Sequence, residues 1–78
     1  MKGYDFIMED RIPIVVYDVS IEDINERRRK AIEYKSIKSA SQNLSLTYNE
    51  IRRAITRRVR VHSPKLDMIV AIRYKANK

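Results

Sequence analysis

The stretch of sequence that decides the fold is residues 36–55, SIKSASQNLSLTYNEIRRAI. Its apolar residues follow helical spacing on both sides of a short break, which is typical of two helices joined by a tight turn. The small Ala40 falls where the first helix must let the second cross closely. The residues expected to be buried are Ala40, Leu44, Leu46, Ile51, Ala54 and Ile55. This pattern predicts a helix-turn-helix over residues 36–58.

The start of the second helix is marked by Thr47 and Glu50. The Thr47 hydroxyl can accept the amide hydrogen of Glu50 while the Glu50 carboxylate reaches back to the Thr47 amide, which makes a reciprocal capping box. Because the helix start is fixed, the positions on its exposed face follow from the sequence.

Those exposed positions are suited to reading DNA. If the second helix, about residues 47–58, enters a major groove, the exposed residues near its start face the base edges. We expect base contacts from Tyr48, Asn49, Arg52 and Arg53. Asparagine pairs with adenine and arginine with guanine, which discriminates by about 1–3 kcal/mol. Packing at the helix start is an equal alternative for Tyr48, and one arginine is expected to bind phosphate.

A second group of polar residues is suited to the DNA backbone. Free amides and hydroxyls at a helix start hold phosphate oxygens, and basic side chains beside a recognition helix add further contacts. We expect backbone contacts from Ser36, Lys38, Ser39, Thr47, Arg57, Arg58, Arg60 and Lys65. For Arg58 the alternative is a stem laid along the core. The basic run at residues 27–30 is either another phosphate contact or a solvated surface.

The charge of the chain is high and unevenly distributed. The formal net charge is +7 over 78 residues. Residues 1–26 hold two basic and seven acidic side chains, a net −5, whereas residues 27–78 hold fifteen basic and three acidic ones, a net +12. A basic excess beside a helix-turn-helix favours a polyanionic partner. The acidic part is expected to contact a protein partner or to fold back and compete with DNA.

Composition argues against an enzyme, a metal protein and a membrane protein. Residues 1–78 make one small domain with little room for an active site. There is no cysteine, and His62 is the single histidine, so we expect no catalytic residue, cofactor or metal. Without a secretory signal or a long apolar span, we expect the cytoplasm of a bacterial or phage-infected cell and no membrane partner.

The flanking segments predict an α+β fold, a small helix-turn-helix with an N-terminal strand or hairpin and a C-terminal β wing. Residues 1–11 are a lead-in and residues 12–35 the strand or hairpin region, in which Pro13 suggests a strand at a sheet edge. Residues 59–75 are the wing.

Within the wing, a short strand at residues 59–61, a turn at 62–65 and a strand over 66–74 are expected. Met68, Val70 and Ile72 share the face of the last strand that is expected to pack under the helices.

Residues 20–35, SIEDINERRRKAIEYK, allow two interpretations. Ser20 with Asp23 resembles a helix start. However, Arg28 interrupts the apolar stripe that a helix needs, and residues 30–35 alternate as a returning strand does. The pattern slightly favours a hairpin with its turn near residues 22–26, and a helix remains the alternative.

The order of these features resembles the modular helix-turn-helix domains found beside phage homing endonucleases. The similar segments are residues 16–18, 34–41, 44–47, 51–55 and 72–74. The resemblance implies a module that grips DNA without chemistry of its own and, in stand-alone phage versions, a small regulator. The family usually has glycine where this chain has Ser45, and its strand-to-helix connection is shorter than residues 19–35.

The leading hypothesis is therefore a small, sequence-preferring protein that binds double-stranded DNA, as a transcriptional regulator or a DNA-targeting accessory of phage or mobile-element origin. Useful specificity would require a homodimer, a repeated site or a protein partner. The alternative is a factor that binds a host enzyme such as RNA polymerase, or a virion component, through its basic face. RNA binding ranks last because no exposed aromatic platform is evident.

Overall fold

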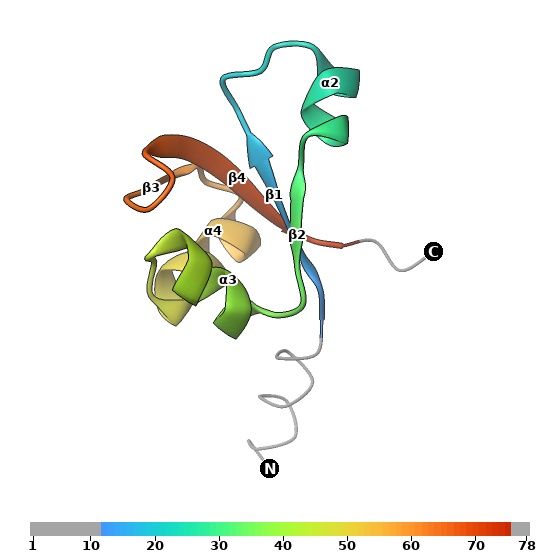
Figure 1. Ribbon diagram of the computed structural model, residues 1–78. Coiled ribbons are helices and arrows are strands. Elements are labelled where there is room, and N and C mark those ends of the chain that lie inside the picture. The colour runs from blue at the N-terminus through green and yellow to red at the C-terminus, as the bar shows by residue number, and fades with distance from the viewer. Residues whose placement is uncertain (1–11, 76–78) are drawn as a thin grey trace.

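The computed structural model describes residues 12–75, which form an α+β arrangement of three helices and a four-stranded antiparallel sheet (Figure 1). The strands are β1 (Ile14–Asp18), β2 (Ile32–Tyr34), β3 (Val61–Ser63) and β4 (Met68–Tyr74), and the helices are α2 (Ile24–Arg29), α3 (Ile37–Leu44) and α4 (Tyr48–Arg57). The strand order across the sheet is β2-β1-β4-β3. The lead-in predicted for residues 1–11 lies outside the described residues.

Strands β1 and β4 form the centre of the sheet, with Val16 opposite Ile72. Because β1 pairs with β2 on one side and β4 on the other, it is an interior strand, and its predicted place at a sheet edge is wrong. Pro13 precedes the first paired residue of β1, and its carbonyl oxygen accepts a 2.9 Å hydrogen bond from the Lys75 amide. The missing proline amide hydrogen therefore falls outside the ladder.

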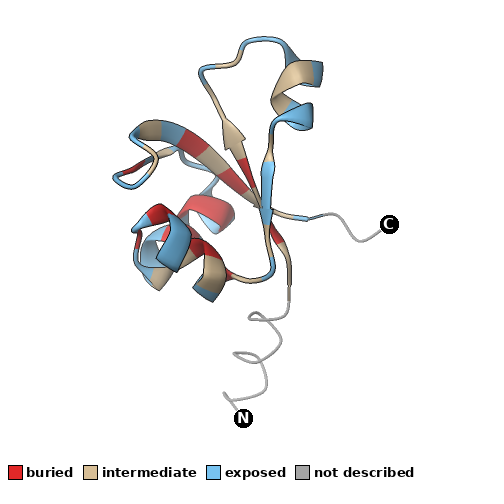
Figure 2. Cartoon of the chain, in the orientation of Figure 1, coloured by how far each residue is buried: buried red, intermediate tan, exposed pale blue. Residues whose placement is uncertain are grey.

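The core lies between one face of the sheet and helices α3 and α4, where the buried residues gather (Figure 2). Side chains alternate between the two faces of a strand, so Val16, Val70 and Ile72 are buried while their neighbours are more exposed. All six apolar residues predicted to be buried within residues 36–55 belong to this core. Each fully buried isoleucine or leucine stabilises the fold by about 1.5–3 kcal/mol, which fixes the face that each helix turns inward.

A tight turn joins α3 to α4. Ser45 ends α3 in the left-handed conformation, with φ 57° and ψ 42°. Ser41 makes two hydrogen bonds to Leu46, the residue that follows Ser45. The Ser41 carbonyl accepts the Leu46 amide at 3.2 Å, and the Ser41 hydroxyl donates to the Leu46 carbonyl. Leu46 is thereby directed into the core before Thr47 starts α4.

Residues 20–35 contain both of the alternatives weighed from the sequence. Helix α2 covers most of residues 22–26, so the turn predicted there is wrong. Strand β2 then returns antiparallel to β1, as the hairpin interpretation required. The connection between the two strands is therefore a helix with short flanking loops, which lies beyond the end of β1 in Figure 1.

Helix α2 is short and buries no residue, so local polar contacts define it. Asp23 caps its start by accepting the Glu26 amide at 2.9 Å. Arg27 donates to the carbonyl oxygens of Ile21 and Val19 at 2.8 and 3.3 Å, which ties the helix to the preceding loop. The N-cap is Asp23 and not Ser20, because the Ser20 hydroxyl donates its hydrogen bond to the Asp18 carboxylate instead.

The hairpin of β3 and β4 is shifted relative to the prediction. The turn was expected at residues 62–65, but His62 and Ser63 belong to β3 and the turn comprises residues 64–67. The last strand accordingly begins at Met68, two residues later than predicted. Ser63 extends β3 because its fully buried hydroxyl donates a 2.8 Å hydrogen bond to the carbonyl of Leu44.

Candidate functional site

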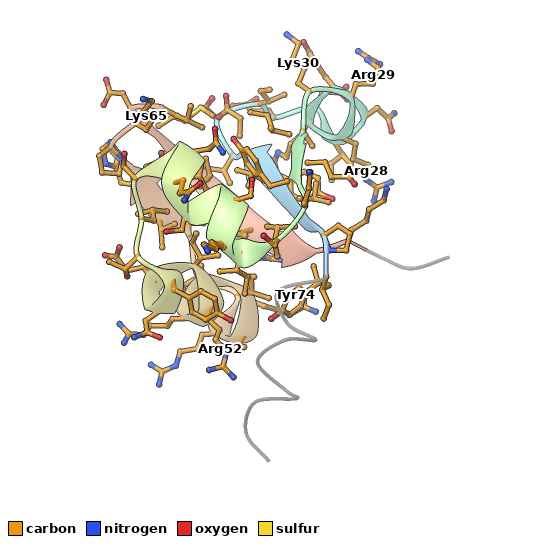
Figure 3. The ribbon with its side chains drawn as sticks, turned by 60° about the horizontal axis from the view of Figure 1, so that its bottom comes forward. Arg28, Arg29, Lys30, Arg52, Lys65 and Tyr74 are labelled. Atoms are coloured by element: carbon orange, nitrogen blue, oxygen red, sulfur yellow. The ribbon has the colours of Figure 1, made fainter. Side chains whose placement is uncertain are left out.

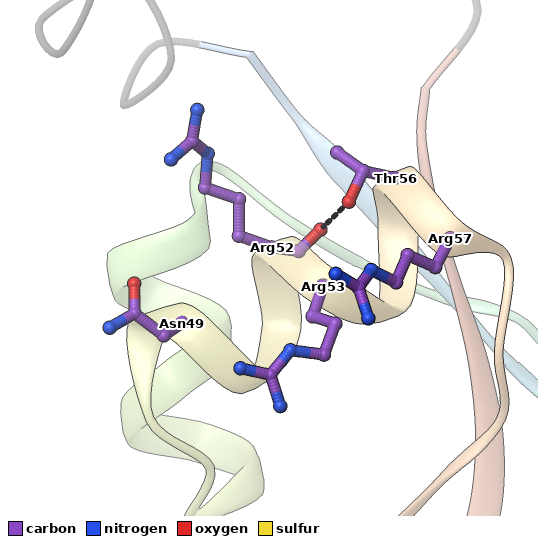
Figure 4. Close-up of a pocket in the computed structure, with 5 residues that line it drawn as sticks. All are labelled: Asn49, Arg52, Arg53, Thr56 and Arg57. Carbon is purple, nitrogen blue, oxygen red and sulfur yellow. Dashed lines mark hydrogen bonds between the residues drawn. The ribbon is translucent and has the colours of Figure 1, made fainter.

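Five polar side chains line a shallow hollow of about 280 Å³ on the exposed face of α4 (Figure 4). They are Asn49, Arg52, Arg53, Thr56 and Arg57. All five are exposed, because the opposite face of the helix is committed to the core through Ile51, Ala54 and Ile55. Three of the five are cations and none is an acid, so the hollow is a strongly positive surface.

The arginines of the hollow differ in orientation. Arg52 extends away from Arg53 and Arg57, whose side chains leave the helix in another direction (Figure 4). Within residues 12–75, the guanidinium groups of Arg53 and Arg57 make no hydrogen bond or ion pair. Their charges are therefore available to an anion, and each planar fork can bind phosphate or a guanine edge bidentately.

The start of α4 is fixed by the predicted capping box, which is confirmed. The Thr47 hydroxyl accepts the Glu50 amide at 3.1 Å, and the Glu50 carboxylate accepts the Thr47 amide at 2.8 Å. The one acidic residue of α4 is thereby directed back to the helix start and does not line the hollow. The Thr47 hydroxyl therefore serves to cap α4, and the residue remains exposed to solvent.

Tyr48, expected to contact bases, has a different environment from the other three residues of that set. It is half-buried and packs against the core, which matches the alternative weighed for it in the sequence. The remaining members of the set, Asn49, Arg52 and Arg53, lie together in the hollow. The structure therefore brings three of the four expected base-contact residues onto one surface.

The start of α3 is arranged as its sequence suggested. Ser36 caps the helix by accepting the Ser39 amide at 3.2 Å, and both serines are half-buried. Lys38 is exposed between them. The Ser36 hydroxyl is thus engaged within the chain, and the exposed charges at this helix start are Lys38 and, just before the cap, Lys35.

The basic residues expected at the DNA backbone do not all lie on one surface. Arg57 belongs to the hollow, and Arg58 and Arg60 follow it, both exposed. Arg58 ends α4 in the left-handed conformation, with φ 55°, and its exposure does not match a stem laid along the core. Lys65, in the β3–β4 turn, lies on the far side of the molecule from Arg52 (Figure 3).

A second basic cluster occurs at the end of the molecule opposite to Arg52, where Arg28, Arg29 and Lys30 lie on and just after α2 (Figure 3). Lys30 pairs with Glu26 at 3.2 Å, so its charge is partly compensated. This cluster and the hollow on α4 are therefore two separate basic surfaces (Figure 3). Their separation was not predicted from the sequence.

Thr56 lines the hollow but was not among the expected site residues. Its hydroxyl donates to the Arg52 carbonyl at 2.9 Å (Figure 4). The signal was present in the sequence, because Thr56 falls four residues after Arg52 and therefore on the same helical face.

The chain matches no protein-family model, and it has no significant similarity to a curated protein or to a solved structure. Among residues 12–75 no group of three histidine, cysteine, aspartate or glutamate side chains is placed to hold a metal ion. No helix in the same range has the length and apolarity to cross a membrane. The functional argument therefore depends on the surface of α4.

Proposed function

We propose that this chain is a small, sequence-preferring DNA-binding protein that docks α4 in the major groove. In this proposal α3 and α4 are a helix-turn-helix, and the β3–β4 hairpin is its wing. The observation that carries the proposal is the hollow of α4, where three arginines, an asparagine and a threonine form one exposed face over a buried apolar stripe. An α-helix with such a face fits the width of the major groove.

The residue types in the hollow supply both parts of DNA recognition. Arg53 and Arg57 provide charge for phosphates, whose contacts release counterions and dominate affinity. Asn49 and the arginines provide the hydrogen-bonding groups that pair with adenine and guanine, each good pair discriminating by about 1–3 kcal/mol. An acidic protein surface is the alternative partner, but protein interfaces usually have an apolar centre, and no apolar side chain lines this hollow.

The biological role proposed is that of a phage or mobile-element regulator or a DNA-targeting accessory in the cytoplasm, as the resemblance to modules beside homing endonucleases implies. A single helix gives a limited interface, so we propose that a second copy, a repeated site or a protein partner supplies the remaining affinity. Lys65 would then contact a different DNA segment from α4, or none, because the two lie on opposite sides of the molecule.

The proposal is tested by the salt dependence of binding to duplex DNA, measured by fluorescence anisotropy. Three proteins are compared: the wild type, Arg53→Ala plus Arg57→Ala, and Arg28→Ala plus Arg29→Ala. The two variants lose equal charge from different surfaces. Loss of two phosphate contacts makes the negative slope of log K against log salt shallower by about 2, and we expect this only for the first variant.

Two results would contradict the proposal. Equal slopes in the two variants would mean that charge alone, and not the α4 face, drives binding. No binding by the wild type at about 0.1 M salt, where charges about 10 Å apart are already screened, would remove DNA as the partner.

A further inference from the structure

The sheet face turned away from α3 and α4 carries apolar side chains bordered by arginines. Its centre is Tyr17 and Ala71, which are paired across β1 and β4. Near them, Ile69 on β4 and Ile24 on α2 are 50% and 56% exposed. A hollow of about 180 Å³ joins the two strands to α2, and it is lined by Tyr17, Ile24, Arg27, Arg28, Ala71 and Arg73. We call these six residues, together with Ile69, the outer face.

The arginines approach the apolar centre of the outer face from two sides. Arg27 and Arg28 come from α2, which follows the end of β1. Arg73 lies on β4 opposite Val15, on the other side of Tyr17 along β1. Among the described residues no acidic side chain lines this hollow. The outer face is therefore an apolar centre between cations.

These cations are available to carboxylates. Arg27 is fixed by hydrogen bonds to the main-chain carbonyls of Ile21 and Val19, and Arg73 donates to the carbonyl of Ile72. A guanidinium carries more N–H donors than these bonds use, and its planar fork matches a carboxylate. In the part of the chain that the structure describes, the Arg28 guanidinium makes no hydrogen bond or ion pair.

We infer that the outer face is the docking site for an acidic segment of a partner protein. The segment seats an apolar side chain over Tyr17, Ala71 and Ile24, and its flanking carboxylates pair with Arg28 and Arg73. Charge complementarity selects the acidic character of the segment, and the exposed apolar centre requires that the carboxylates flank an apolar side chain.

Two other ligands fit the outer face less well. Pockets for small molecules measure roughly 300–1,000 Å³, and this hollow is smaller, which suits one side chain of a larger partner. DNA phosphates would pair with the arginines but would leave Ile24 and Ile69 in water, and the hydrophobic gain depends on the apolar area removed from water. Tyrosine and arginine around an apolar centre are typical of protein interfaces.

The position of the outer face keeps it separate from the arginine hollow of α4. Helix α4 packs on the sheet face of Val16 and Ile72. Because successive side chains of a strand alternate between faces, Tyr17 and Ala71 belong to the other face. A partner docked there leaves the exposed face of α4 open. The inference therefore goes beyond the proposed function and does not require DNA.

The inference is tested by NMR titration of the full chain at about 0.1 M salt, where distant charges are screened. The probe is a synthetic peptide with a central leucine-phenylalanine pair flanked on each side by two glutamates. The control peptide has two serines in place of the apolar pair. We expect the probe to shift the amide signals of Tyr17, Ile24, Arg28, Ala71 and Arg73, and the control peptide to shift them much less.

Four results would overturn the inference. Shifts confined to α4 would show attraction to its arginines alone. Equal shifts with the serine peptide would show that the apolar centre is not used. Shifts of the outer-face signals by a short DNA duplex, or by raising the protein concentration without peptide, would assign this surface to DNA or to a second copy. Absence of any shift at about 1 mM peptide would leave no acidic ligand to dock.

Variants of equal charge loss separate the two basic surfaces. Arg28→Ala plus Arg73→Ala should weaken binding of the probe peptide by about tenfold, since two exposed charge pairs are lost. Arg53→Ala plus Arg57→Ala on α4 should leave it unchanged. Because Arg73 is partly buried, Arg28→Glu on the exposed side of α2 repeats the test without that residue. Equal weakening by both double variants, or none by Arg28→Glu, would contradict the inference.

Discussion

The side-chain hydroxyl of Ser63 donates a 2.8 Å hydrogen bond to the main-chain carbonyl of Leu44, nineteen residues earlier. The same oxygen accepts the Leu66 amide at 3.2 Å. Ser63 is fully buried, so both contacts are shielded from water. One side chain therefore ties the β3–β4 turn to the end of α3, just before the turn that leads into α4.

We predict that Ser63→Ala lowers the free energy of unfolding by about 1–3 kcal/mol, because it leaves a buried carbonyl and a turn amide without their partner. Urea unfolding followed by circular dichroism measures the change. Lys65→Ala, on the exposed turn beside it, should stay within about 0.5 kcal/mol. Equal stability of the wild type and Ser63→Ala would show that the hydrogen bond is not needed to hold the hairpin.

We predict that Ser45→Gly raises stability. A residue other than glycine in the left-handed region costs about 1–2 kcal/mol, and glycine adds about 0.5–1 kcal/mol of unfolded-state entropy, so the net gain is roughly 0.5–1 kcal/mol. Ser39→Gly, inside α3, should lower stability by a comparable amount. A lower melting temperature for Ser45→Gly than for the wild type would be incompatible with the φ of 57° at this cap.

The capping box at the start of α4 gives a prediction on the proposed recognition helix itself. Thr47→Ala should cost about 1 kcal/mol, since it removes the acceptor for the Glu50 amide. Thr47→Ser keeps the hydroxyl and should retain most of the stability. Faster hydrogen exchange of the amides at the start of α4 in Thr47→Ala, but not in Thr47→Ser, is the expected measurement. Unchanged exchange in both variants would mean that packing alone defines this helix start.

Asp18 gives a prediction on pH dependence. The Ser20 hydroxyl donates to its carboxylate at 2.7 Å, and this bond, with one from the Ser20 amide and the nearby charges of Arg27 and Lys30, lowers the pKa of Asp18 below its ordinary value of 3.8. A lowered folded-state pKa contributes stability above the unfolded value that is lost as the pH falls through the folded value.

Ser20→Ala should therefore raise the Asp18 pKa in an NMR titration of the carboxyl carbon. It should also destabilise the protein more at neutral pH than in acid, where Asp18 is protonated in both proteins. Ser20→Thr, which retains a hydroxyl, should restore the low pKa. An unchanged pKa in Ser20→Ala would assign the shift to the remaining contacts.

The parts of the fold that were predicted correctly depend on local chemistry. The capping box joins Thr47 and Glu50, three residues apart, and the apolar stripe of α4 repeats within two helical turns. Both features are complete within a short window of sequence, so the exposed face of α4 followed from them. Thr56 belongs to the same window, but beyond the helix start the prediction included only basic side chains and so omitted this uncharged residue.

The parts that were predicted wrongly depend on contacts between distant residues. Strand β1 is interior because β2 and β4 both pair with it, and Pro13 alone suggested an edge. The β3–β4 turn is displaced because Ser63 binds Leu44. Helix α2 is six residues long and buries nothing, so its sequence contains no apolar stripe that would distinguish a helix from a turn. The position of Lys65, far from Arg52, depends on how the β3–β4 hairpin packs, so it could not be predicted from local sequence patterns.

The most direct test of the central claim is selection from a random-sequence duplex pool. The wild type is compared with Arg52→Ala plus Arg53→Ala on α4, and with Arg28→Ala plus Arg29→Ala on α2 as a control of equal charge. Thermal unfolding establishes that each variant folds. We predict that the wild type and the control enrich the same motif, whereas the α4 variant enriches none and retains weak, salt-sensitive binding. No enrichment by the wild type, or the same motif from the α4 variant, would contradict the account.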